Sequence, residues 1–353
     1  MQVDTETTSS IKILVGGAAL FIIIFGMKMS ASILSPILLA VIVGNSVAPA
    51  TGWLRRKGVP DWLALLITIV LVFLGVVGLI ALIGVSVGHL VTTLPQYQDN
   101  LQGQVEGLQT ALANVGLGDS PLHTVLGRFD VGKVFSFFGS VLGGVVSLLS
   151  GLVIMLMVLI FLLLAESGWD TKLRLGFLAD NPTLIRFREL GRDLRQYVGI
   201  TTWINFLVGL INTVLLMLLG VDYAALWGLL SFLMGYIPSV GFWAALVPPF
   251  LLAFLEFGTM RALIVLVGYI VINGGVQNFV EPRMMGAGLN LSPLVVVLSL
   301  FFWAWVLGPM GALLAIPLTL VVKNVFLDAH DETRGLAMLM SASAPAKQSD
   351  QAV

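Results

Sequence analysis

Long apolar runs separated by short polar connectors make up most of the chain. The early runs cover residues 11–25, 33–47, 62–87, 141–165 and 198–219. A helix of about 18 or more apolar residues is long enough to cross the hydrocarbon core of a bilayer. The first two runs are shorter. Small residues follow the first apolar run, as they would at the cleavage site of a signal peptide. The second apolar run begins immediately after them, however, which favours a hairpin of two helices. The pattern predicts an all-α polytopic membrane protein.

Two later apolar segments are interrupted by proline and glycine. The interruptions are Pro238, Gly241, Pro248 and Pro249 in residues 224–257, and Gly308, Pro309, Gly311 and Pro317 in an uncharged run of about thirty residues within 278–322. A segment of about thirty residues would be roughly 45 Å long as a helix, too long for one straight crossing and too short for two. We therefore predict six full spans plus two re-entrant hairpins. The alternative, two kinked single crossings, gives eight spans.

The second half of the chain reads as an inverted repeat of one unit, an amide-bearing span followed by a broken segment. Paired interruptions of this kind indicate the binding site of a transporter, with the two hairpin tips meeting near the midplane. Amides inside a bilayer are costly unless paired, so they either line a pathway or join helices. The predicted substrate-pathway residues are Asn205, Asn212, Pro238, Ser239, Gly241, Asn273, Gln277, Asn278, Pro309, Gly311 and Pro317.

The distribution of basic residues predicts on which side of the membrane each connecting segment lies. Residues 55–57 and 166–197 are rich in Arg and Lys, whereas residues 89–140 are poor in them, so the first two segments are predicted to be cytoplasmic and the third external. Both termini then lie in the cytoplasm. Leu94, Leu101, Leu108 and Val115 repeat every seven residues and predict an external amphipathic helix. That helix either folds onto its own protomer or forms a subunit contact in a homo-oligomer.

The chain is thereby divided into seven regions. They are a disordered N-terminus (1–10), N-terminal membrane helices (11–88), the external segment (89–140), a membrane helix (141–165), a cytoplasmic basic helical segment (166–197), a transport core of two repeats (198–325) and a cytoplasmic polar tail (326–353).

Composition and motifs exclude several classes of function. The chain is 58% hydrophobic and 10% charged, it has no cysteine, and its three histidines are far apart, so neither a metal site nor a cofactor is expected. Gly127, Gly132 and Lys133 have the spacing of a phosphate-binding loop, but Val134 replaces the hydroxyl residue that would hold magnesium. No motif of a metalloprotease or serine hydrolase occurs, so an intramembrane enzyme is disfavoured. The arginines of residues 166–197 alternate with acids beside a span, which favours lipid headgroup contact over nucleic acid.

Membrane carboxylates are few and lie near segment ends. Glu166, Asp222, Glu256 and Glu281 are the candidates, and Glu281 is the one plausible coupling acid. The alternative is that Glu281 forms an ion pair with Arg283 at the membrane interface. Both residues are retained as coupling or gating candidates.

Three motifs of the chain are distinctive: EPRMMGAGLNLSPLVVVLSLFFWAWVLGPMGALLAIPLT from Glu281, WGLLSFLMGYIPSVG at residues 227–241, and TLPQY at 93–97. Together they resemble the AI-2E family of bacterial inner-membrane transporters. The resemblance implies a secondary transporter that exports a small polar metabolite by alternating access. It points first to the quorum-sensing signal autoinducer-2, an uncharged, hydroxyl-rich molecule. Sodium–proton antiport is the alternative that the family implies, with a proton or sodium as coupling ion.

Overall fold

The computed structural model describes residues 4–114, 131–176, 182–285, 291–328 and 333–341, and every regular element within these ranges is a helix. The chain forms two compact units. Unit 1 comprises Met1–Val70, Ser150–Val198 and Leu289–Val353, and unit 2 comprises Leu71–Leu149 and Gly199–Gly288. Each unit is therefore assembled from segments that are far apart in the sequence.

Six described helical segments are long and apolar enough to cross a membrane, which confirms the all-α polytopic class. They are Ala31–Arg56, Asp61–Leu90, Gly143–Ala165, Ile185–Leu219, Val240–Phe257 and Thr259–Val280. Three belong to longer helices: α3 (Asp61–Asn114), α5 (Val131–Gly176) and α6 (Pro182–Leu219). In each of these, polar and apolar parts that the sequence separates into different regions form one continuous helix.

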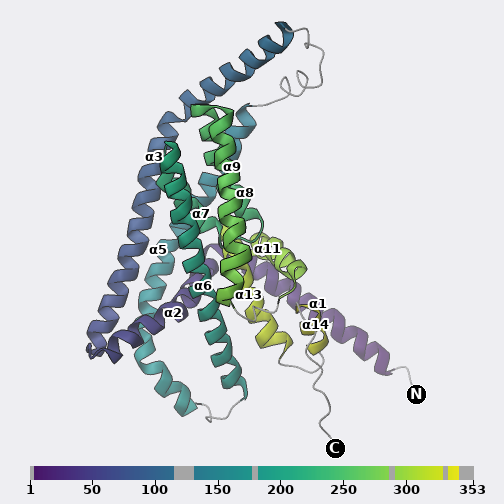
Figure 1. Cartoon of the computed structure of the whole chain (residues 1–353). Coiled ribbons are helices and arrows are strands. Elements are labelled where there is room, and N and C mark those ends of the chain that lie inside the picture. The colour runs from purple at the N-terminus through teal and green to yellow at the C-terminus, as the bar shows by residue number, and fades with distance from the viewer. Residues whose placement is uncertain (1–3, 115–130, 177–181, 286–290, 329–332, 342–353) are drawn as a thin grey trace, which may run out of the picture. The chain divides into compact units, whose positions relative to one another are not determined.

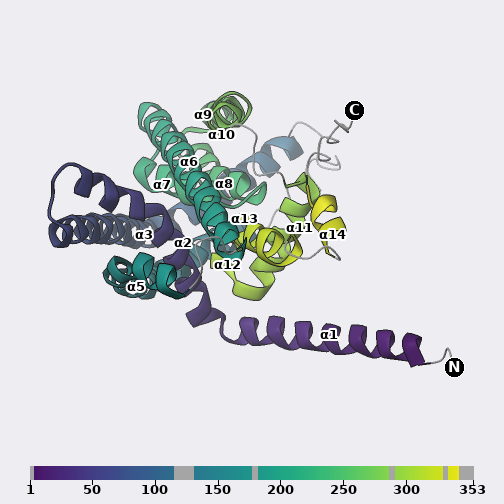
Figure 2. The same ribbon diagram turned by 90° about the horizontal axis from the view of Figure 1, so that it is seen from below.

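The N-terminal helices are longer than the apolar runs that predict them. Helix α1 covers Asp4–Met29, so it extends into residues predicted to be disordered, and α2 covers Ala31–Arg56. Figures 1 and 2 show α1 leading away from α2 after the break at Ser30, so the two do not pack side by side as a hairpin. Near its end α1 meets α11, where Lys28 Nζ lies 3.8 Å from the centre of the Trp305 ring.

Unit 2 continues from α6 into α7 (Ala224–Met234), α8 (Val240–Phe257), α9 (Thr259–Gly275), the π-helix η1 (Val276–Val280) and α10 (Glu281–Met285). Helices α8 and α9 lie side by side (Figure 1). Helix α6 crosses α7 where two glycines face each other, because a Cβ on Gly209 would lie 2.6 Å from the Gly228 carbonyl oxygen. A crossing of small residues brings two backbones close together, as is common between membrane helices.

Unit 1 contains the second broken segment as α11 (Pro293–Leu307), α12 (Pro309–Leu313), α13 (Ala315–Val321) and the π-helix η2 (Val322–Leu327), followed by α14 (Arg334–Leu339). Gly308 has φ +70° and reverses the chain after α11. Trp303 Nε1 then donates to Thr319 Oγ1 across the turn at 3.1 Å. Helix α11 contacts both α12 and α13, and Val295 and Val325 pack against the same buried cluster, so this segment is folded back on itself.

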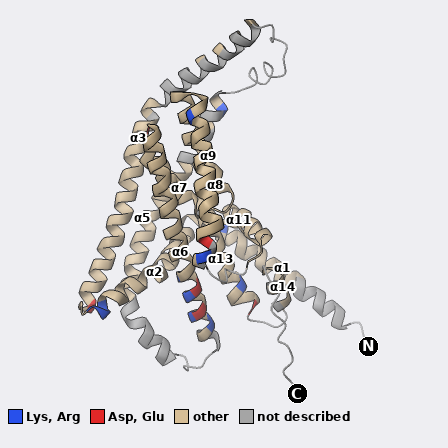
Figure 3. Ribbon diagram, in the orientation of Figure 1, with Lys and Arg blue, Asp and Glu red and all other residues tan. Residues whose placement is uncertain are grey.

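Charged side chains are concentrated in the first half of α6. Figure 3 shows Lys and Arg interleaved with Asp and Glu there, while the remainder of α6 is free of charge. Leu190 and Leu194 of the same half are buried among the side chains of α11 and α13, so this part of α6 is amphipathic. The charged face follows the predicted pattern of a basic helix at a membrane surface.

Candidate functional site

The first broken segment is also folded back on itself. The Asp222 backbone N–H, just before α7, donates to Glu256 Oε2 at the end of α8 (3.4 Å). Arg261 Nη1 of α9 donates to the carbonyl oxygen of Leu219 at 3.1 Å. Both ends of the α7–α8 hairpin therefore lie at the same end of unit 2. Helix α7 has 11 residues and α8 has 18, so the two arms of the hairpin differ in length.

The turn between α7 and α8 is compact because of two glycines. A Cβ on Gly241 would overlap the carbonyl oxygen of Met234, so the start of α8 presses on the end of α7. A Cβ on Gly235 would overlap the side-chain amide of Asn205, so the turn lies directly on α6. Pro238 is partly buried within the turn, and Ser239 is exposed at its tip. The structure thus brings four of the predicted residues together in unit 2.

Helix α6 carries buried polar side chains along one face, and one of them, Asn205, lies beside this turn. Asn212 is 0% exposed and Asn205 is 7% exposed, and Thr201 is also buried. Among the described residues, Asn212 Oδ1 and Nδ2, Asn205 Nδ2 and Thr201 Oγ1 have no hydrogen-bond partner. The three residues are spaced by four and seven positions, so they share one face of the helix. Unpaired buried polar groups are rare in proteins, and each requires an explanation.

Two further polar side chains lie in the packing of α6, α7 and α9. Ser231 Oγ of α7 donates to the hydroxyl oxygen of Tyr269 on α9 at 3.5 Å, and both residues are buried. The π-helix η1, which continues α9, also packs on α6 through Val276 and Val208. We call Thr201, Asn205, Asn212, Ser231 and Tyr269 the polar seam. A polar seam inside apolar helices can bind a solute through hydrogen bonds without any charged group.

The amides of α9 are placed differently from those of α6. Asn273 Nδ2 donates to the Tyr269 carbonyl oxygen of its own helix at 2.8 Å, and Asn278 Nδ2 donates to that of Gly274 at 2.7 Å. Gln277 and Asn278 are exposed within η1. The structure does not bring these two side chains to the polar seam. Their position in a π-helix is notable because π-helical turns often occur at functional sites.

The predicted residues of the second break are packed within unit 1. A Cβ on Gly311 would overlap the carbonyl oxygen of Trp303, so α12 presses on the end of α11. Pro309 begins α12 and is exposed, whereas Pro317 is buried in α13. Gly311 therefore plays the same part in this hairpin as Gly241 does in the other. The predicted meeting of the two tips stays a prediction.

Glu281 and Arg283 are not joined by an ion pair in the part of the chain that the structure describes. They are two positions apart in α10, and side chains two apart on a helix do not face each other. Glu281 is half-buried just beyond the span that ends at Val280, and burial raises the pKa of its carboxyl group. Arg283 is exposed.

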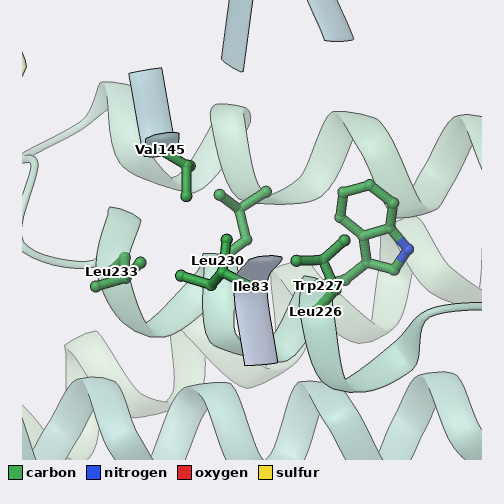
Figure 4. Close-up of a pocket in the computed structure, with 6 residues that line it drawn as sticks. All are labelled: Ile83, Val145, Leu226, Trp227, Leu230 and Leu233. Carbon is green, nitrogen blue, oxygen red and sulfur yellow. The ribbon is translucent and has the colours of Figure 1, made fainter. Parts of the chain in front are cut away.

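A small apolar cavity in unit 2 is a poor candidate for a polar solute. Figure 4 shows its lining, which is Ile83, Val145, Leu226, Trp227, Leu230 and Leu233. Its volume open to a water-sized sphere is about 10 Å³. That is space for about one water molecule, and the apolar lining offers it no polar partner. The polar seam is therefore the better candidate.

Sequence reasoning missed several polar residues that the structure places near the seam or in the core. Thr201 could have been found because it lies four residues before Asn205 on the same helical face. Ser231 and Tyr269 carry no such signal, since only the packing of α7 against α9 joins them. In unit 1, Lys323 of η2 is 8% exposed, and its Nζ lies 3.8 Å from Asp328 Oδ2.

The fold defines a polytopic α-helical membrane protein with a buried polar seam. The model of the AI-2E family transporter matches residues 17–330, and the chain belongs to that family. It is 32% identical to the AI-2 transport protein TqsA of Escherichia coli strain K12, over 95% of this chain and 97% of that one. It is 30% identical to the "Putative transport protein YhhT" of the same strain, over 98% of each chain. Its relatives are transport proteins, so the chain is a transporter and not an enzyme.

Proposed function

We propose that this transporter exports a small polar metabolite by alternating access, with autoinducer-2 as the first candidate. The observation that carries the proposal is a pair of buried amides on one face of α6. Asn205 Nδ2, beside the turn of a folded-back hairpin, and both polar atoms of Asn212, two helical turns further along, have no partner among the described residues. A buried amide without a partner costs free energy, so it is expected where a ligand supplies the missing hydrogen bonds. The name of the relative TqsA supports the choice of solute.

The test is a flux measurement in proteoliposomes that contain the purified chain. Autoinducer-2 loaded inside is expected to leave these vesicles faster than it leaves protein-free vesicles, and unlabelled solute on the other side should compete. A matched set of small neutral polyols measures selectivity. Equal leak from both kinds of vesicle, for every solute in the set, would exclude this function.

Sodium–proton antiport is the second candidate, and one observation favours it. Burial raises the pKa of Glu281, so its carboxyl group is more easily protonated than an exposed one. If protonation of Glu281 couples sodium transport to proton transport, Glu281→Gln is expected to abolish sodium-driven proton movement in vesicles. If the chain exports a neutral solute without this coupling, flux of that solute is expected to persist in Glu281→Gln.

We further propose that the chain lies in the bacterial inner membrane with both termini in the cytoplasm. Because the native chain has no cysteine, single cysteines report the side of the membrane without background. Ser136→Cys, on the exposed surface of α5, should react with an impermeant thiol reagent added outside cells. Arg192→Cys, whose parent side chain is 74% exposed on the basic half of α6, should react only after the cells are opened. The reverse pattern would invert the predicted orientation.

A further inference from the structure

The tip of the α7–α8 hairpin contains an unusual backbone turn. The Val240 backbone N–H donates to the Pro238 carbonyl oxygen at 2.6 Å, which closes a three-residue γ-turn around Ser239. Ser239 has φ +61° and ψ −49°. This form of the γ-turn is rare and strained for a residue with a side chain. Strained backbone persists only where its surroundings hold it, and it occurs preferentially at functional sites and switch regions.

Contacts with α6 hold this tip in place. The hydroxyl groups of Tyr236 and Thr202 are 2.6 Å apart and share a hydrogen bond. One residue earlier, Gly235 lies against the side-chain amide of Asn205. The Tyr236 ring is further supported by an edge contact with Phe232, with ring centroids 5.8 Å apart. The tip therefore covers the part of the polar seam where Asn205 Nδ2 has no partner among the described residues.

We infer that the α7–α8 tip is a gate over Asn205, and that Tyr236 and Thr202 form the latch that holds it closed. The inference rests on the proposed function, because a gate is useful only to a protein that moves a solute. Two local effects oppose each other at the tip. The Tyr236–Thr202 hydrogen bond favours the closed position, and the strained backbone at Ser239 favours a movement that relaxes it.

The gate moves as one piece because the turn is tightly packed within itself. Gly241 presses on the Met234 carbonyl oxygen, and the Gly241 N–H donates to the Ile237 carbonyl oxygen at 3.1 Å. Residues 234–241 thus form a compact cap whose displacement would expose the Asn205 amide to water or solute. Tyr236 and Thr202 are positioning residues, since they act through the location of the cap.

The test uses Asn205→Cys as a reporter in the full chain, reconstituted in lipid nanodiscs, with a small polar thiol reagent as the probe. Tyr236→Phe removes only the latch hydroxyl and is expected to raise the labelling rate about fivefold, since one neutral hydrogen bond is lost. Ser239→Gly relieves the strain of the closed position and is expected to lower the rate about fivefold. Opposite shifts from two neighbouring substitutions are not expected from general loosening.

Matched controls separate the gate from nonspecific effects. Tyr223→Phe also removes a hydroxyl group that shares a hydrogen bond, with Thr93 at 3.0 Å, but at the other end of the α7–α8 hairpin, and should leave labelling of Asn205→Cys unchanged. Asn212→Cys, two turns further along α6, should label at the same rate with and without Tyr236→Phe. If Tyr236→Phe does not fold, Thr202→Val removes the same bond from the other side and should give the same increase.

The inference is overturned if Tyr236→Phe and Ser239→Gly shift the rate in the same direction, if neither shifts it, or if Tyr223→Phe acts as strongly as Tyr236→Phe. Labelling requires no transported solute, so it is independent of the flux measurement. A chain that passes the labelling test but moves no tested solute would keep its gate and lose its proposed function.

Discussion

Gly241→Ala and Gly311→Ala are each expected to abolish transport. A single methyl group at either position would overlap a backbone carbonyl oxygen, that of Met234 in the first hairpin and that of Trp303 in the second. Backbone cannot yield as a flexible side chain can, so each hairpin must open at its turn. We expect flux in proteoliposomes to fall to the level of protein-free vesicles for both variants.

The controls for these variants are glycines that face open space. Gly199 of α6 and Gly52 of α2 have no atom within 4 Å of an added Cβ. Gly199→Ala and Gly52→Ala should therefore keep normal flux, with at most a small gain in helix stability, because alanine is the better helix former. Normal flux in Gly241→Ala would show that the first turn can deform without consequence, and the close packing described for it would have no role in transport.

Asn212→Leu is expected to stabilise the protein while it strongly reduces transport. Its amide is fully buried, and neither of its polar atoms has a partner within the described chain. Replacing it with an apolar side chain of similar size removes a desolvation cost of about 1–3 kcal/mol. The midpoint of thermal unfolding in detergent should rise, and solute flux should fall at least tenfold.

Asn273→Leu serves as the comparison for stability. The Asn273 amide donates to the Tyr269 carbonyl oxygen, so its replacement removes a hydrogen bond and should not raise the unfolding midpoint. A lowered midpoint in Asn212→Leu would mean that the Asn212 amide joins helices, which is the other interpretation of buried membrane amides. The sign of the change therefore separates the two roles.

The all-α class and the positions of the main helix breaks could be predicted from the sequence, because both depend on local chemistry. Gly308 reverses the chain with a positive φ, as glycine readily does, and it lies inside the predicted second break. The first break was placed correctly at Pro238 and Gly241, where the chain turns between α7 and α8. Proline alone does not end a helix, however, because α8 continues through Pro248 and Pro249, which the sequence analysis predicted as interruptions.

The side-chain environments could not be predicted in the same way. Asn205 and Asn278 are both amides in apolar helices, but one is buried beside a turn and the other is exposed and bonded to its own helix. Only the packing of α6 against α7 distinguishes them. The positive φ of Ser239 was also unpredictable, because a serine ordinarily avoids that conformation unless its surroundings impose it.

The crossing of α6 and α7 at Gly209 and Gly228 gives the hairpin a lever arm. The two backbones touch there, so the crossing point is the natural fulcrum for any tilt of α7 against α6. Gly235 lies seven residues beyond Gly228, an arm of about 10 Å along the helix axis. A tilt of about 10° would move the end of that arm by about 2 Å, enough to carry a hydroxyl pair beyond hydrogen-bonding distance. The tip could then uncover Asn205 while α7 and α6 stay in contact along their glycines.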